Sequence, residues 1–286
     1  MRYHFFIIFF LVCSSYIFSR SRNLTIGQAI QLKVAKVKVN KVNGYSGKCL
    51  SLSVLNLTDD SLYLLVTPGW IFDSDDSTKQ DLMVIKEFLF ALDMNQSKLG
   101  DIFVNCCQMK KLSPTGSKFS KNKTAKLELR ALAEFLNEHD YPSNVVCNAV
   151  WAISDNQPIS SICGSGSEKD QELRKKVSEL MKKELPWYSV TTETKEHEDG
   201  RIESLQKSLF GEFTCNIPKG TEFTIKLTDR KGREIMMLQP KLKAKDNLQN
   251  YYVEFSVENL PKKEFFITFT NNRGKDLVKK SVDLRS

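Results

Sequence analysis

The stretch FTIKLTDRKGREIMML, residues 223–238, decides the fold class of the C-terminal part of the chain. Phe223, Ile225 and Leu227 alternate with polar residues, and this period of two is typical of a strand with one buried face. Residues 229–232 (DRKG) have the composition of a turn, and a second apolar run follows them directly. The stretch therefore predicts two strands joined by a short turn.

Similar short runs continue toward the C-terminus at residues 251–257, 265–270 and 277–282. Short strands at close spacing, separated by turn signals, are typical of a small β-sandwich. We therefore expect a β-sandwich over residues 205–286. The segment before it, residues 187–204, is polar and charged without an apolar period, and we expect it to be a linker.

The part of the chain before this linker, residues 24–186, mixes strand and helix patterns. Residues 35–39 alternate between apolar and polar side chains, and we expect strands over residues 26–67. The apolar run at 83–92 fits a strand or a helix equally well. Three later segments place apolar residues at helical spacing, namely 124–138, 144–154 and 168–185. These patterns predict a mixed β/helical domain.

The first 19 residues have the composition of a secretory signal peptide. Arg2 precedes an apolar run at residues 5–12, and Ile17 and Ser19 fit the small-residue positions before a cleavage site after Ser19. The run is shorter than the roughly 20 residues that cross a bilayer, and the rest of the sequence shows no transmembrane segment. A lipoprotein modified at Cys13 is the alternative. We expect a secreted or cell-surface protein of bacterial type.

The net charge of +8 is concentrated near the C-terminus. Residues 201–286 contain 17 Lys and Arg residues against 11 Asp and Glu residues. These charges are spread along the segment, which fits solvent-exposed strand faces, while an acidic glycan or membrane surface as partner is the alternative. We expect the partner to be an extracellular protein or glycan, which would be acidic if the alternative holds. We expect no binding to nucleic acid.

Few residues are available for catalysis. After the cleavage site the sequence has two histidines, His139 at the end of a predicted helix and His197 in the predicted linker. No nucleotide-binding, metalloprotease or serine-hydrolase motif is present. An acidic loop is a weak candidate for Ca²⁺ binding, with a solvated loop as the alternative, and its carboxylates are Asp73, Asp75, Asp76 and Asp81. No other cofactor is expected.

Six cysteines follow the signal peptide, and export would allow them to form disulfides: Cys49, Cys106, Cys107, Cys147, Cys163 and Cys215. The informative ones are the adjacent pair Cys106-Cys107 and Cys147 within VCNAVW (residues 146–151). With these motifs, residues 45–160 resemble the thioester domains of bacterial surface proteins. In that family a cysteine after a strand bonds to the glutamine of a T-Q-x-A-I-W motif, and the thioester captures host amines covalently.

Cys147 stands where the family has its glutamine, and two thiols cannot form a thioester. The resemblance therefore implies a disulfide between Cys147 and either Cys106 or Cys107, because adjacent strand residues face opposite sides and only one can reach Cys147. The alternative is that all three are small buried apolar side chains. Gln80 and Gln108 are the substitute acyl donors to consider, and neither lies in the motif.

The C-terminal segment carries a second resemblance. Ile225–Ile235, with a strand, a D-x-x-G turn and a strand, is similar to immunoglobulin-like modules of the flagellar hook-cap and type IX sorting-domain kind, although the P-N-P entry of the sorting domains is absent. We therefore expect an α+β protein, with the mixed domain followed by a small immunoglobulin-like sandwich. The expected function is non-catalytic binding or a structural role outside the cell. The alternatives are a secreted hydrolase that uses carboxylates and, as a minor one, a covalent thioester adhesin.

Overall fold

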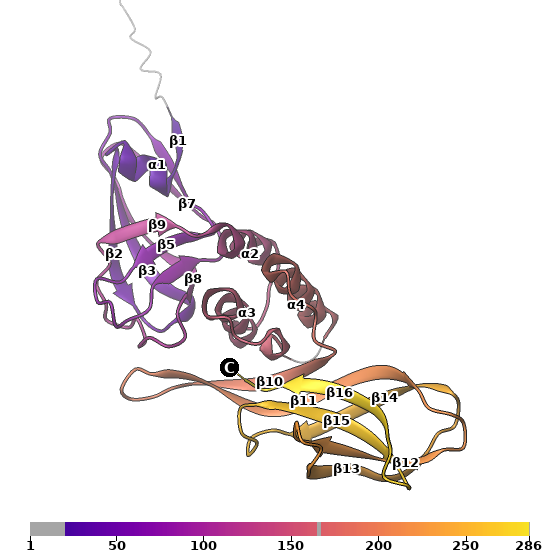
Figure 1. Ribbon diagram of the computed structural model, residues 1–286. Coiled ribbons are helices and arrows are strands. Elements are labelled where there is room, and N and C mark those ends of the chain that lie inside the picture. Colours follow the sequence, from indigo (N-terminus) through magenta and orange to yellow (C-terminus); the bar gives the residue numbers. More distant parts are fainter. Residues whose placement is uncertain (1–20, 165–166, 286) are drawn as a thin grey trace, which may run out of the picture.

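The computed structural model describes residues 21–164 and 167–285. Within these ranges the chain has a β-rich α+β fold, which confirms the expected fold class. Figure 1 shows an N-terminal region of strands and helices above a C-terminal region built from strands. The predicted signal peptide, residues 1–19, lies outside the described residues.

The N-terminal region runs from residue 21 to residue 186. Its strands are β1 (Arg22–Thr25), β2 (Ala35–Val42), β3 (Ser46–Asn56), β4 (Leu62–Val66), β5 (Trp70–Asp73), β6 (Leu82–Val84), β7 (Phe88–Leu92), β8 (Ser97–Cys106) and β9 (Lys121–Thr124). Its helices are α1 (Ile26–Gln31), α2 (Leu127–Glu138), α3 (Ser143–Asp155), the short 3-10 helix η1 (Ile159–Ser161) and α4 (Glu168–Met181). The helices α2, α3 and α4 lie where the apolar spacing predicted them, and the ambiguous run at 83–92 forms most of β6 and β7.

Two sheets and three helices enclose the cores of this region. The large sheet has the order β2-β3-β8-β6-β5-β9, and the small sheet has the order β1-β4-β7. Leu52 of β3 and Leu64 of β4 are fully buried in one shared core, so the two sheets pack on each other. Met83 of β6 and Cys107, which follows β8, belong instead to a second core beneath α2, α3 and α4. The two cores therefore lie on opposite faces of the large sheet, because neighbouring residues of one strand, such as Leu82 and Met83 of β6, belong to different cores. Figure 1 shows the helices beside this sheet.

Residues 26–31 form α1, so the prediction of strands across residues 26–67 was wrong for this segment. The Gln28 amide N–H donates to Thr25 Oγ1 at 3.3 Å, and the Thr25 N–H donates to Gln28 Oε1 at 2.9 Å. These reciprocal bonds satisfy amide groups that a helix N-terminus leaves open. Ile26 and Ala29, three residues apart, are then fully buried on one face. Local capping thus favours a short helix where apolar content alone indicated a strand.

The C-terminal region runs from residue 187 to residue 285. Its strands are β10 (Tyr188–Glu196), β11 (Ile202–Asn216), β12 (Glu222–Thr228), β13 (Glu234–Lys243), β14 (Leu248–Ser256), β15 (Glu264–Asn271) and β16 (Asp276–Asp283). They form one sheet of order β10-β11-β14 and another of order β13-β12-β15-β16. Leu209 and Val253 of the first sheet share a core with Ile225 and Ile267 of the second. The hairpin predicted from residues 223–238 is the β12–β13 pair.

The expected linker at 187–204 is instead a strand pair, because β10 and the first part of β11 pair antiparallel there. Figure 1 shows this hairpin extending beneath the N-terminal region. Most of its side chains are polar and reach solvent, whereas Val190 is buried in the C-terminal core and Ile202 in the first N-terminal core. The sequence interpretation was wrong because backbone pairing with a partner strand, and not apolar content, orders this segment.

Arg174 of α4 joins the two regions. Its side chain is 1% exposed, and its guanidinium donates to Ser189 Oγ at 2.7 Å, to the Pro186 carbonyl at 2.7 Å and to the Tyr188 carbonyl at 2.6 Å. Charge-assisted hydrogen bonds of this kind are about twice as strong as neutral ones. The buried Arg174 guanidinium therefore holds the start of β10 against α4 through these hydrogen bonds.

The hairpin position of Ile202 leads to a first prediction. Because Ile202 is 6% exposed within the first N-terminal core, Ile202→Ala should lower the free energy of unfolding by about 2 kcal/mol. Urea unfolding followed by circular dichroism measures this change. Lys195→Ala, at an exposed position of the same hairpin, is the control and should leave stability nearly unchanged. Equal effects of the two variants would contradict an anchoring role for Ile202.

Candidate functional site

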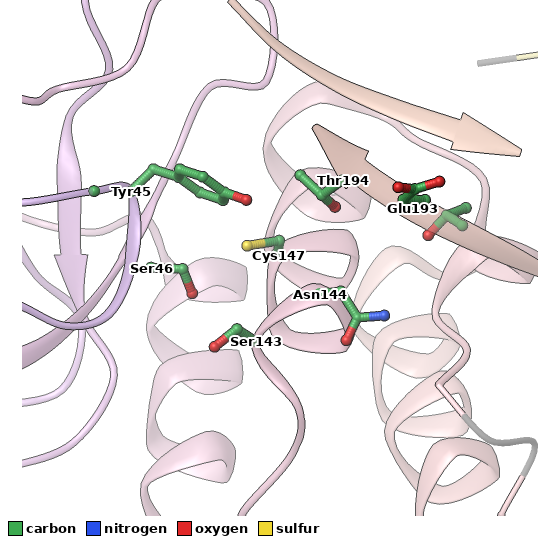
Figure 2. A pocket seen from close by; sticks show the side chains of 9 residues that line it. Tyr45, Ser46, Ser143, Asn144, Cys147, Glu193 and Thr194 are labelled. Carbon is green, nitrogen blue, oxygen red and sulfur yellow. The ribbon is translucent and has the colours of Figure 1, made fainter. Parts of the chain in front are cut away.

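A pocket lies where the hairpin meets the N-terminal region (Figure 2). Its volume is about 520 Å³, within the range of small-molecule sites. We call it the junction pocket, and its lining residues come from the β2–β3 turn, from the start of α3 and from β10: Gly44, Tyr45, Ser46, Ser143, Asn144, Cys147, Thr192, Glu193 and Thr194. Both regions of the chain therefore contribute to one site.

Local structure positions each wall of the junction pocket. Gly44 has a φ of +101°, a left-handed conformation that glycine adopts without strain, and this turn presents Tyr45 and Ser46 to the pocket. On the opposite wall, Asn148 Nδ2 donates to Thr192 Oγ1 at 2.8 Å and to the Ser161 carbonyl at 2.8 Å. Asn148 is 2% exposed, so this buried amide ties β10 to α3 and sets the width of the pocket.

A polar cluster surrounds Cys147 at the inner end of the junction pocket. The Cys147 thiol donates to Asn105 Oδ1 at 3.2 Å, and the Ser46 hydroxyl donates to the same oxygen at 2.8 Å. Asn105 Nδ2 in turn donates to the carbonyl of Cys106 at 3.0 Å. Asn105 is fully buried. Its Oδ1 atom accepts hydrogen bonds from both Ser46 and Cys147 and so keeps these two side chains close together.

Cys106 and Cys147 lie in the same core, close enough for each to shift the pKa of the other. The interaction with Cys106 lowers the pKa of Cys147 below its ordinary value. Burial raises the pKa of Cys106, and the interaction with Cys147 adds to that rise. The two sulfurs therefore differ, because the one at the pocket holds a negative charge more readily than the one behind it.

Cys107 lies on the other side of β8 and belongs to the second core, beneath the helices. It lines a different pocket, of about 730 Å³, between the large sheet and the helices α2, α3 and α4. Of the two neighbours, Cys106 is thus the one that lies close to Cys147, in keeping with the alternation of strand side chains. The structure holds the described cysteines as thiols, and a Cys106–Cys147 disulfide stays a prediction.

Tyr45 points toward Cys147 across the junction pocket (Figure 2). Burial, followed by the nearby Cys147 and Cys106, raises the pKa of Tyr45 to about 12. The phenol is therefore neutral at physiological pH and can donate or accept a hydrogen bond. Its ring supplies the apolar wall of a pocket that is otherwise lined mainly by hydroxyl, amide and carboxylate groups.

The structure does not gather the candidate Ca²⁺ ligands around one point. Asp75 accepts from the Ser120 hydroxyl at 2.6 Å and Asp76 from the Thr78 hydroxyl at 2.7 Å. Each of these bonds lowers the pKa of its carboxyl group. Both side chains thus order their own loop, as short acidic residues do in turns.

The other two carboxylates of that loop, Asp73 and Asp81, are paired with Lys123. Asp81 also accepts from the Ser74 amide at 3.0 Å and from Gln108 Nε2 at 2.8 Å. Lys123 therefore offsets one of the two negative charges, and Asp81 has two further donors. Within the described ranges, no three His, Cys, Asp or Glu side chains are placed to hold a metal ion.

The two histidines lie away from the junction pocket. His139 bonds through Nδ1 to the Phe135 carbonyl at 2.8 Å and stacks on the Phe135 ring. His197, near the tip of the hairpin, pairs with Glu203 at 3.1 Å. Neither histidine lines the pocket beside Cys147, so the structure provides no cysteine–histidine pair there.

The two glutamines considered as acyl donors are also held elsewhere. Gln80 Nε2 donates to the Lys111 carbonyl at 3.0 Å. Gln108 accepts from the Asp81 amide N–H at 2.7 Å and donates to the Asp81 carboxylate at 2.8 Å. Neither side chain lines the junction pocket.

Sequence reasoning identified Cys106 and Cys147 but missed the rest of the site. Tyr45 and Ser46 directly follow Asn43-Gly44, a dipeptide typical of turns, and Asn105 directly precedes Cys106, so these neighbours were the available signal. Thr192 and Glu193 carry no such signal, because they lie in a segment that looked like a linker. Only the pairing of β10 with β11 brings them to the pocket.

In comparisons with known proteins, the chain matched no family model and no curated protein. The two resemblances drawn from its motifs therefore stay predictions. Among the residues that the structure describes, no helix combines the length and apolar character needed to cross a membrane. The function must be argued from the site itself.

Proposed function

We propose that the protein is exported and binds an extracellular glycan in the junction pocket without catalysing a reaction. The observation that carries this proposal is the composition of the pocket wall, which combines hydroxyl and amide groups with one aromatic ring. Pockets that bind small ligands use a few convergent polar groups for orientation and apolar surface for affinity. The predicted signal peptide supports an extracellular site of action.

The pocket chemistry fits a ligand rich in hydroxyl groups. Ser143 can donate and accept, the amide of Asn144 does both, and the Ser46 oxygen, whose proton goes to Asn105, can accept. A sugar presents the complementary donors and acceptors on neighbouring carbons, so each of its buried hydroxyls can find a partner. The Tyr45 ring offers a flat apolar face for the C–H side of a sugar ring.

For the C-terminal region we propose an immunoglobulin-like sandwich. In chain order, its first, second and fifth strands share one sheet, and the fourth, third, sixth and seventh share the other. The constant-type immunoglobulin arrangement differs from this order only in the fourth strand, which pairs with the first sheet there. Such modules commonly serve as extracellular binding or spacer domains, which agrees with an exported protein.

The two other functions considered from the sequence have less support. A carboxylate hydrolase would need acidic side chains that converge on a cleft, whereas the acidic-loop carboxylates are bonded to Ser120, Thr78 and Lys123. A thioester adhesin of the kind that the motif resembles would need a glutamine beside the cysteine, and the carboxamide in contact with Cys147 belongs to an asparagine, Asn105. Neither alternative explains a pocket wall made from both regions.

The test of this proposal is a binding screen with mature protein beginning at Arg20. We expect retention on neutral or acidic glycans, with Tyr45→Ala and Asn144→Ala each weakening binding by about tenfold, near 1.4 kcal/mol. The control is Tyr63→Ala, which removes an exposed ring on β4, and it should bind like the unmodified protein. Isothermal titration against the best glycan measures the affinities.

Each other result counts against the proposal. No retention on any glycan would contradict this ligand class, and binding that survives both pocket variants would place it outside the junction pocket. Turnover of a glycan that is lost in Asp73→Asn would support the hydrolase instead. A mass increase of the unreduced protein with methylamine would support covalent capture, because an amine opens a thioester and leaves a disulfide intact.

A further inference from the structure

Two neighbouring thiols lie at the inner end of the junction pocket, and both are buried, with Cys147 1% and Cys106 0% exposed. Cys147 lines the pocket, and Figure 2 shows its sulfur directed toward Tyr45 and Ser46. Cys106 is fully buried behind it, in the core shared by the two N-terminal sheets. The glycan proposal uses neither sulfur. We propose that Cys147 and Cys106 are a thiol pair that undergoes exchange, through this pocket, with low-molecular-weight disulfides.

The surroundings of Cys147 favour attack by this sulfur. Cys106 and Ser46 both lie close to Cys147, and the Cys106 thiol has a proton that it can donate to a Cys147 thiolate. Hydrogen bonds to the charged form stabilise that form, and the thiolate is the reactive species in exchange. Asn105 fixes the position of Ser46 by accepting its hydroxyl at 2.8 Å.

The exchange balances in two steps. The Cys147 thiolate attacks one sulfur of a disulfide RSSR, so that a Cys147–SR bond forms and one RS⁻ leaves and takes up a proton. Cys106 then loses its proton and attacks the Cys147 sulfur, so that the Cys106–Cys147 bond forms and the second RS⁻ leaves. The two protein thiols are oxidised, and the small disulfide is reduced to two thiols. The order follows from access, because an entering disulfide meets Cys147 first.

Three of the other described cysteines are placed differently. Cys107 faces the second core on the other side of β8, and Cys215 is buried in the C-terminal core. Cys49 of β3 is half-buried beside the first core, where burial raises its pKa to about 12. Cys147 is close enough to Cys49 to raise the pKa of Cys49 further. Cys49 is therefore the alternative disulfide partner of Cys147 that the experiment must distinguish from Cys106.

The experiment treats fully reduced, folded full-length protein with glutathione disulfide and follows intact mass and peptide maps. We expect the unmodified protein to gain a Cys106–Cys147 bond without keeping a glutathionyl group. Cys106→Ser should stop at the mixed disulfide, with one glutathionyl group on Cys147. Cys147→Ser should leave Cys106 unmodified. Circular dichroism of each variant verifies that it is folded, and Cys107→Ser is the matched control that should react like the unmodified protein.

A second variant tests the route without changing a thiol. Ser143 lies at the exposed rim of the pocket, and Ser143→Phe should slow the modification of Cys147 by about tenfold by narrowing the entrance. The proposal is overturned if folded Cys106→Ser keeps an unmodified Cys147 that reacts only after unfolding in urea. It is also overturned if Cys49 maps as the partner of Cys147, or if Ser143→Phe reacts at the unmodified rate.

Discussion

Replacing Arg174 by alanine is expected to lower the free energy of unfolding by about 4 kcal/mol. The guanidinium is buried and supplies hydrogen bonds to one hydroxyl and two carbonyl oxygens at the start of β10. Alanine would leave these buried acceptors without donors, and each unsatisfied group costs about 1–3 kcal/mol. Alanine is itself a good helix former, so α4 gains no intrinsic weakness. Urea unfolding followed by circular dichroism measures the loss.

Two further variants distinguish the loss of the Arg174 hydrogen bonds from the loss of a positive charge on α4. Lys175→Ala removes a charge at the next, exposed position of α4 and should change stability by less than about 0.5 kcal/mol. Arg174→Lys keeps the charge but loses the planar fork of donors, and we expect a loss between those of the other two. A loss in Arg174→Ala as small as in Lys175→Ala would show that the guanidinium does not hold the junction.

The second large effect concerns the Cys106–Cys147 bond. If the bond forms after export, it closes a loop of residues 106–147, and the chain-entropy relation gives a stabilisation of about 4 kcal/mol. The oxidised protein should therefore unfold at a higher urea concentration than the same protein kept in a reducing agent. The physical reason is that the cross-link restricts the unfolded chain, while the two thiols already lie close together in the folded one.

The matched variants for this comparison are Cys147→Ala and Cys107→Ala. Cys147→Ala should abolish the difference between the oxidised and reduced samples, whereas Cys107→Ala should retain it, because Cys107 lies in another core. Peptide mapping of the oxidised sample identifies the bond directly. The prediction fails if the unmodified protein shows the same urea midpoint with and without reductant, or if Cys107 is found joined to Cys147.

The sequence predicted the parts of the fold that depend on local periodicity. The helices α2 and α3 and the hairpin of β12 and β13 appear close to their expected positions, because an apolar stripe at period 3.6 or 2 must be buried in its own conformation. The expectation that a single member of Cys106-Cys107 could face Cys147 followed from strand alternation alone. These features need no knowledge of distant partners.

The sequence did not predict the features that depend on contacts between segments far apart in the chain. The segment at 187–204 is polar enough to resemble a linker, yet β11 supplies its backbone partner and the N-terminal core receives Ile202. Similarly, the four carboxylates of the acidic loop resemble metal ligands in sequence. In the structure, these carboxylates are instead bonded to Ser120, Thr78 and Lys123.

The sequence by itself determined the α+β class, the helices α2, α3 and α4 and the β12–β13 hairpin, and it limited the partner of Cys147 to Cys106 or Cys107, since each follows from a repeating pattern or a short motif. Only the tertiary structure decided that β10 closes the pocket beside Cys147 and that Arg174 and Asn148 hold it there. The reason is physical: hydrogen bonds between segments far apart in the chain depend on where the backbones come together. No local pattern of residue types encodes that position.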